Sequence, residues 1–184
     1  MKDEKSKVII TKSRKLNLDV LKQALIELEL SERISLTKVI AIKPNLTAGT
    51  LYSGESGVVT RSQLLEMIIA SLKDCNDEGK IYIVESDDAS AKFEYQGYDK
   101  LMKKYDRVEL LDLARDNQRR VNIEKGCFFE TIDLSEKLLS SDFFISCAIM
   151  KTHPLTTISG ILKNQRLLFP NLKRQMQSFS SKLW

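Results

Sequence analysis

Polar side chains that could bind or transform a ligand follow four apolar segments of the chain. They are Lys43 and Asn45, Glu85, Asp112, and Lys151 with His153. Lysine binds carboxylates and phosphates, and histidine is the only side chain whose unperturbed titration falls near neutral pH. These residue types predict an enzyme-like site for a small anion. Lys43 and Lys151 would clamp the ligand, Asn45 would orient it, and Lys151 and His153 would be the catalytic residues, with His153 as acid or base.

Each of these residues also has a structural interpretation, which the sequence leaves open. The alternative for Lys43 is a solvated lysine at a strand end, and the alternative for His153 is a residue that caps the turn before Pro154. Glu85, together with Asp87, is suited to a metal or a sugar hydroxyl, or equally to the start of a helix. Two further residues, Lys163 and Asn164, either return to the same site and bind substrate or close a helix. One histidine cannot build a typical zinc site, so no metal is predicted.

Motifs of the common nucleotide-binding and hydrolytic enzymes are absent from the sequence. It contains no phosphate-binding loop of the form GxxxxGK[ST], no GxGxxG after a strand, and no GxSxG elbow. The three cysteines, Cys75, Cys127 and Cys147, have no cluster-binding spacing, so no iron–sulfur ligand motif exists and the cofactor is unknown. Cys147 lies in an apolar run, which is typical of an inert core cysteine.

The elements that must position these residues alternate between apolar strands and amphipathic helices. Strands are predicted at 8–11, 36–42, 80–84, 108–113 and 143–150, the last one central, with two extended pieces within 121–134 around Gly126. Helices are predicted at 18–30 with Asn17 as N-cap, at 61–74 with Thr60 as cap, at 93–105 interrupted by Gly97, at 134–139 and from 157 to 164. This order predicts an α/β fold: a mostly parallel sheet covered by helices on both faces, with ligands bound at the carboxyl ends of its strands.

Length and charge narrow the class of protein. The chain has 184 residues, which suits one α/β domain at 1–170 followed by a basic polar tail, or the start of a missing segment, at 171–184. Its net charge of +4 comes from 29 basic and 25 acidic residues spread along the chain, which argues against a nucleic-acid binder. No run is long enough for a membrane span and the sparse cysteines suit a reducing compartment, so we expect a cytoplasmic protein.

Four segments, in this order, resemble the markers of the domain of unknown function 362 family. They are Ile42-Lys43-Pro44-Asn45-Leu46, Val84-Glu85-Ser86, Met150-Lys151-Thr152-His153 and Ser159-Gly160-Ile161-Leu162-Lys163-Asn164. The resemblance covers about residues 7–170 and implies the architecture rather than a reaction. Many members are described as iron–sulfur proteins because they carry a ferredoxin-like segment, which this sequence lacks. Members are usually longer, so we expect a fragment or a shortened member whose sheet is incomplete at its C-terminal end.

A rival hypothesis from a different class is a non-catalytic module. In this interpretation the chain is a redox-partner or assembly domain that lacks its own cluster and whose missing half comes from another chain. An incomplete parallel sheet exposes an edge and an apolar patch, and both favour association. The expected partners are therefore a small anionic ligand or, in the rival case, a second copy or another chain that covers the edge.

Overall fold

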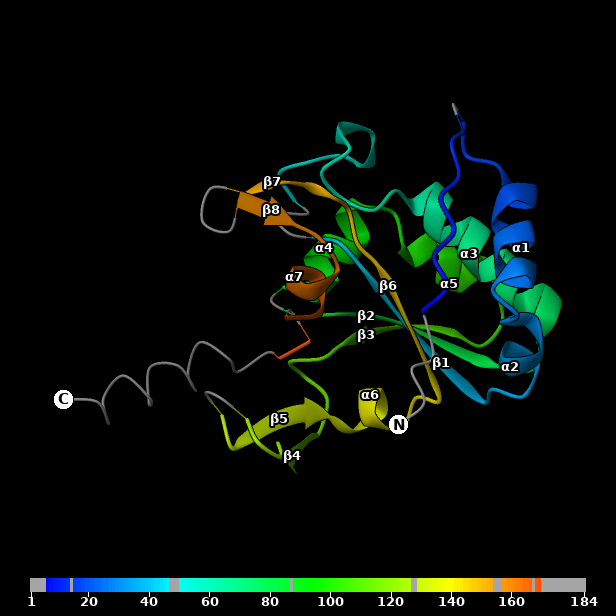
Figure 1. Ribbon diagram of the computed structural model, residues 1–184. Helices are drawn as coiled ribbons and strands as arrows, with labels where there is room; N and C mark the ends of the chain where they lie inside the picture. The colour runs from blue at the N-terminus through cyan, green and yellow to red at the C-terminus, as the bar shows by residue number, and fades with distance from the viewer. Residues whose placement is uncertain are drawn as a thin grey trace.

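A four-stranded parallel sheet forms the centre of the molecule, as the computed structural model shows (Figure 1). The structure describes residues 6–13, 15–46, 50–86, 88–126, 129–153, 157–166 and 168–169. The strand order is β3-β2-β1-β6. The bounds of these strands are Val39–Pro44 for β1, Lys80–Glu85 for β2, Val108–Asp112 for β3 and Phe143–Cys147 for β6. The predicted α/β fold with a parallel sheet is confirmed.

Alternate residues of each central strand enter two different cores. In β1, Ile40 and Ile42 belong to the larger core, whereas Ala41 between them belongs to the smaller one, because successive side chains of a strand point to opposite faces. β2 alternates in the same way, and Tyr82 and Val84 join the smaller core. Apolar residues on both faces explain why these strands are apolar throughout their length, as expected for a parallel sheet.

Helices before β3 cover the face of the larger core. α3 spans Ser62–Cys75, and its buried residues Leu65, Ile69 and Leu72 repeat at helical spacing, so they form one stripe that packs on the sheet. The other helices of this group are α1 (Leu18–Glu27), α2 (Ser31–Ser35), α4 (Ala89–Tyr95) and α5 (Asp99–Lys104). The short 3-10 helix η1 (Gly54–Ser56) comes between β1 and α3 in the chain and has no buried residue.

Two predicted helix boundaries are confirmed and one is wrong. The Asn17 side chain accepts a hydrogen bond of 2.9 Å from the Asp19 N–H at the start of α1. Gly97 has a φ of 71°, in the left-handed region, and separates α4 from α5. Thr60, however, does not cap α3: the N-cap is Arg61 without a side-chain bond, because the Thr60 hydroxyl bonds to two other strand-end segments.

Smaller elements follow β3. β4 (Gln118–Asn122) and β5 (Thr131–Ser135) are the two extended pieces predicted around Gly126, and the structure pairs them antiparallel. α6 (Glu136–Leu139) leads into β6. After β6, the strands β7 (Lys151–His153) and β8 (Thr157–Ser159) pair antiparallel, and α7 (Ile161–Arg166) follows. In Figure 1 the β7–β8 hairpin and α7 lie together beyond the carboxyl ends of β1 and β6.

Three further predictions are wrong. Residues 8–11 form no strand. The apolar run 143–150 is a shorter strand, Phe143–Cys147, and it lies at the edge of the sheet rather than at its centre, with half-buried side chains. The start of the predicted helix 157–164 is a strand, because residues 157–159 pair with residues 151–153 and the helix begins only at Ile161. No helix in the described part of the chain is long and apolar enough to cross a bilayer.

Candidate functional site

A buried ion pair joins the carboxyl ends of β1 and β2. The Lys43 Nζ lies 2.9 Å from the Glu85 Oε2, and both side chains are 0% exposed. The ammonium also donates to the Pro44 carbonyl at 2.8 Å, and the second Glu85 oxygen accepts from the Ser86 N–H at 2.8 Å. Burial lowers the pKa of Lys43, although the Glu85 carboxylate opposes that shift. Both charges are therefore directed at each other and away from solvent.

Asn164 on α7 completes this interior group. Its Nδ2 donates to the Lys43 carbonyl and to the Ser146 Oγ, each at 3.0 Å, so it connects α7 to both β1 and β6. The residue is 2% exposed, and its Oδ1 accepts no hydrogen bond from the described residues. We call Lys43, Glu85, Ser146 and Asn164 the buried polar group.

Thr60 ties the loop before α3 to the ends of two strands. Its hydroxyl accepts from the Asn45 N–H at 2.8 Å and donates to the Cys147 carbonyl at 2.9 Å. The Tyr98 hydroxyl donates to the Thr60 carbonyl at 2.7 Å, which anchors the same loop to the start of α5. Desolvation raises the pKa of Tyr98, so its hydroxyl stays a donor. Asn45 is thus held at its backbone, and the residue is buried, with 2% of its surface exposed.

Lys151 is the link between the strand ends and the surface. Its ammonium donates to the Val58 carbonyl at 2.6 Å and to the Asn45 Oδ1 at 3.2 Å. A lysine has three N–H donors, so one donor has no partner among the described residues. Burial lowers the pKa of Lys151, and the charge of Lys163 lowers it further.

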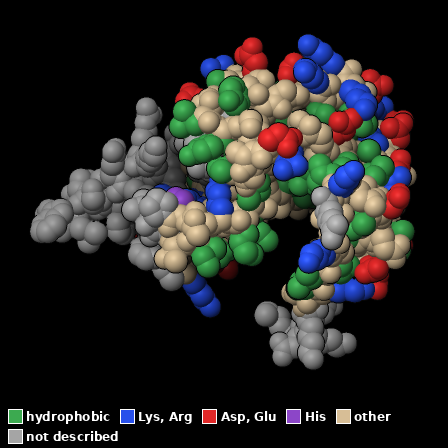
Figure 2. All heavy atoms as spheres, turned by 90° about the horizontal axis from the view of Figure 1, so that it is seen from above, with side chains coloured by type: hydrophobic (Ala, Val, Ile, Leu, Met, Phe, Trp, Pro, Cys, Tyr) green, Lys and Arg blue, Asp and Glu red, His purple; other side chains and the backbone are tan. Residues whose placement is uncertain are grey.

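His153 and Lys163 lie with Lys151 in a second group, which we call the cationic cluster. Desolvation lowers the pKa of His153, and the charges of Lys163 and Lys151 add to that shift. Its imidazole is therefore neutral at pH 7. Desolvation and Arg166 lower the pKa of Lys163. Figure 2 shows the single histidine, in purple, beside blue Lys and Arg side chains.

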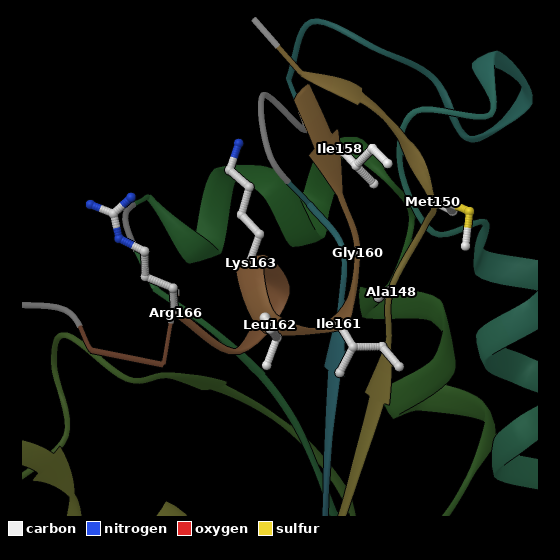
Figure 3. A pocket seen from close by; sticks show the side chains of 8 residues that line it. All are labelled: Ala148, Met150, Ile158, Gly160, Ile161, Leu162, Lys163 and Arg166. Carbon is white, nitrogen blue, oxygen red and sulfur yellow. The ribbon is translucent and has the colours of Figure 1, made fainter. Parts of the chain in front are cut away.

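An open cavity of about 700 Å³ adjoins this cluster (Figure 3). Its walls come from the end of β6, from β8 and from α7, and the lining residues are Ala148, Met150, Ile158, Gly160, Ile161, Leu162, Lys163 and Arg166. Most of these lining residues are apolar, and the basic side chains of Lys163 and Arg166 form the polar part of the cavity. Lys163 belongs both to this lining and to the cationic cluster.

Comparison with known proteins shows the family of the chain. The model of the family described as Domain of unknown function (DUF362) matches residues 40–182. The chain belongs to this family. Searches of the curated proteins and of the solved structures gave no match. The DUF362 match begins at β1 and contains all seven site residues predicted from the sequence, so the resemblance inferred from the strand-end segments is confirmed.

The structure divides the seven predicted residues of this DUF362 chain between the two groups. Lys43, Glu85 and Asn164 lie in the buried polar group, Lys151, His153 and Lys163 form the cationic cluster, and Asn45 contacts Lys151. The prediction that Lys43 and Lys151 clamp one ligand stays a prediction. Lys43 has no exposed surface, and its ammonium donates to Glu85 and to the Pro44 carbonyl, so the geometry favours a positioning role for it.

The described residues show no metal-binding group, and two residues of the sequence analysis lie outside the described part of the chain. The described residues contain no group of three or more His, Cys, Asp or Glu side chains that could hold a metal ion. Asp87, the suggested companion of Glu85, and Cys127 lie outside the described residues. Burial raises the pKa of the Cys147 thiol to about 12, as expected for an inert core cysteine.

Sequence reasoning missed three residues that shape this part of the DUF362 fold. The sequence analysis predicts a helix cap for Thr60 and no role for Tyr98 or Ser146. In the structure, the Thr60 and Tyr98 hydroxyls donate hydrogen bonds at the strand ends, and the Ser146 hydroxyl accepts one. A polar hydroxyl within the apolar stretch Phe-Phe-Ile-Ser-Cys was the available signal for Ser146. A hydroxyl that is even half-buried inside a strand needs a hydrogen-bond partner, and for Ser146 that partner is Asn164.

Proposed function

We propose that the chain binds a small anionic ligand, a carboxylate or a phosphate, at the cationic cluster of Lys151, His153 and Lys163. The observation that carries this proposal is the charge imbalance of the cluster. Lys163 lies close enough to lower the pKa of both Lys151 and His153, and no carboxylate among the described residues forms an ion pair with Lys151 or Lys163. A bound anion supplies the missing opposite charge and relieves the repulsion.

Each residue has a distinct role in this proposal. Lys151 contacts the anion through its remaining N–H, while Val58 and Asn45 fix the direction of its amine. Lys163 adds a second positive charge, and neutral His153 accepts a proton from the ligand or from water. Lys43, Glu85 and Asn164 act as positioning residues, because they hold β1, β2 and α7 in register from inside.

Titration with inorganic phosphate, followed by isothermal titration calorimetry, tests the proposal. Lys163→Ala is the cleanest variant, because the structure gives the Lys163 amine no hydrogen bond to a described residue. We expect it to weaken binding at least about fivefold, which corresponds to roughly 1 kcal/mol of lost attraction. Lys103→Ala, at an exposed position on α5 with a side chain 74% exposed, is the matched control and leaves binding unchanged. Equal affinities for both variants would refute the proposal.

The pH dependence of binding separates the role of His153 from that of the lysines. The pKa of His153 lies below its usual 6.5, so the imidazole gains its positive charge only as the pH falls through the acid range. We therefore expect the wild type to bind an anion more tightly as pH decreases from 7 to about 5. His153→Gln should lose most of that increase while it keeps its affinity at pH 7. An unchanged pH profile would remove His153 from the site.

Association through β6 is a second candidate, because the two edges of the sheet differ. The edge strand β3 carries Glu109 and Asp112, whereas β6 is the uncharged sequence Phe-Phe-Ile-Ser-Cys and pairs with β1 alone among the described strands. Charged residues protect an edge strand from pairing with another chain, and β6 has none. Sizing chromatography with light scattering over a range of concentrations tests this candidate. A monomer at every concentration contradicts self-association.

A further inference from the structure

The cavity beside the cationic cluster combines two kinds of surface. Met150 and Leu162 are each 85% exposed, Ile158 is 63% exposed and Ile161 is 58% exposed, although all four line the same cavity. In Figure 3, Lys163 and Arg166 extend to one side of Gly160, whereas Ile158, Met150 and Ile161 lie on the other side. Contiguous exposed apolar side chains next to charged ones are characteristic of a binding surface.

We infer that the anion bound at the cationic cluster carries an apolar body, so that the ligand is an amphiphilic carboxylate or phosphate whose body lies in the cavity. This inference rests on the proposed function, because Lys163 supplies part of both surfaces. The volume of about 700 Å³ lies within the range of pockets for small organic molecules, whereas an inorganic anion would leave most of it empty.

Lys163 is the residue through which one ligand reaches both surfaces, because it lines the cavity and its charge acts on Lys151. Lys151 pairs with Ser159, and Thr152 pairs with Ile158, so Ile158 projects from the face of the hairpin opposite to Lys151. Met150 directly precedes Lys151, and Leu162 directly precedes Lys163. Of the apolar lining residues, these two have a basic neighbour in sequence. A charged headgroup at Lys163, which itself lines the cavity, places the body of the ligand against the apolar lining residues.

A homologous series of alkyl phosphates tests this inference. Inorganic phosphate and butyl, hexyl and octyl phosphate are titrated below the concentrations at which they aggregate, which light scattering verifies. We expect each buried methylene to tighten binding by about threefold to fourfold. Octyl alcohol, which has the same body without a charge, should bind much more weakly than octyl phosphate.

The variant Met150→Gln/Leu162→Gln locates the apolar contact. Both side chains are largely exposed, so the substitutions should leave the fold intact. We expect this variant to lose the dependence on chain length but to keep its affinity for inorganic phosphate. Met102→Gln on α5, which packs beside the opposite edge strand, is the matched control and should change neither affinity.

The possible outcomes distinguish this inference from the proposed function. Equal affinity for inorganic and octyl phosphate overturns the apolar body but leaves the anion site intact. A chain-length effect that survives Met150→Gln/Leu162→Gln, or octyl alcohol that binds as tightly as octyl phosphate, also overturns the inference. If none of the phosphates binds, both the inference and the proposed function fail.

Discussion

Replacing Lys43 by methionine tests whether the buried ion pair holds the strand ends together. The substitution removes the positive charge but keeps a long apolar side chain, so it creates little cavity. Glu85, at 0% exposure, would then keep a negative charge whose remaining donor is the Ser86 N–H. Breaking a buried ion pair by removing one partner costs about 3–5 kcal/mol. That is a large share of the roughly 5–15 kcal/mol that stabilises a typical domain.

Urea unfolding followed by far-UV circular dichroism measures this loss. The only tryptophan is Trp184, outside the described residues, so its fluorescence is not a suitable probe of the core. With a slope of about 2–3 kcal/mol per molar urea, the unfolding midpoint of Lys43→Met should fall by about 1–2 M.

Two further variants complete the test. In Lys43→Met/Glu85→Gln both charges are absent while Ser86 keeps an acceptor, so this double variant should be more stable than Lys43→Met alone. Lys80→Met is the matched control, because the Lys80–Glu109 pair is 2.7 Å long but 37% and 46% exposed. Exposed pairs contribute about 0–1 kcal/mol. If Lys43→Met destabilised the protein no more than Lys80→Met, the buried pair would not hold the strand ends as argued.

Three other predictions concern groups around the strand ends. Thr60→Val leaves the buried Asn45 N–H without its acceptor, and we expect a loss of about 1–3 kcal/mol in urea unfolding that Thr60→Ser largely avoids. Burial raises the pKa of the Cys147 thiol from 9.0 to about 12, so the folded state keeps its proton where the unfolded state ionises. Stability should therefore fall between pH 9 and 12, by about 1.4 kcal/mol per pH unit for this group, and Cys147→Ala should show a correspondingly smaller fall. Asp142→Ala removes the acceptor of two backbone N–H groups at the start of β1 and should cost about 1–2 kcal/mol by the same unfolding assay, a loss that Asp142→Asn should reduce.

Much of the fold was predictable because local patterns determine it. Short apolar segments bounded by polar residues indicated the strands of the parallel sheet, and Gly97 marked the break between two helices. The position of β6 was not predictable in the same way. An apolar run reports that side chains are buried, but the strands beside it are set by contacts between residues distant in sequence. β6 has one described neighbour, although its composition is typical of a central strand.

The site was predictable in its residues but not in their pairing. Because parallel strands end at one edge of the sheet, residues that follow them are expected to meet, and five of the seven predicted residues are selected on that ground. The sequence could not show that Lys43 points inward to Glu85, which lies 42 positions away, or that Asn164 binds the Lys43 carbonyl. These contacts depend on the strand order and on the position of α7, neither of which leaves a local pattern.

The arrangement of the two groups explains why the interior contains an ion pair, which stability alone does not explain. An apolar pair of similar volume would often be equally or more stable than a buried ion pair. Here, however, two of the four buried residues are close in sequence to residues that belong to the cationic cluster or contact it: Asn164 follows Lys163, and Lys43 is two positions before Asn45, whose Oδ1 accepts from the Lys151 amine. Hydrogen bonds within the buried polar group fix the backbone at these points with directional contacts, which apolar packing does not provide. The cationic cluster therefore depends on the interior for its geometry, and a substitution in the buried polar group should disturb ligand binding without any contact to the ligand.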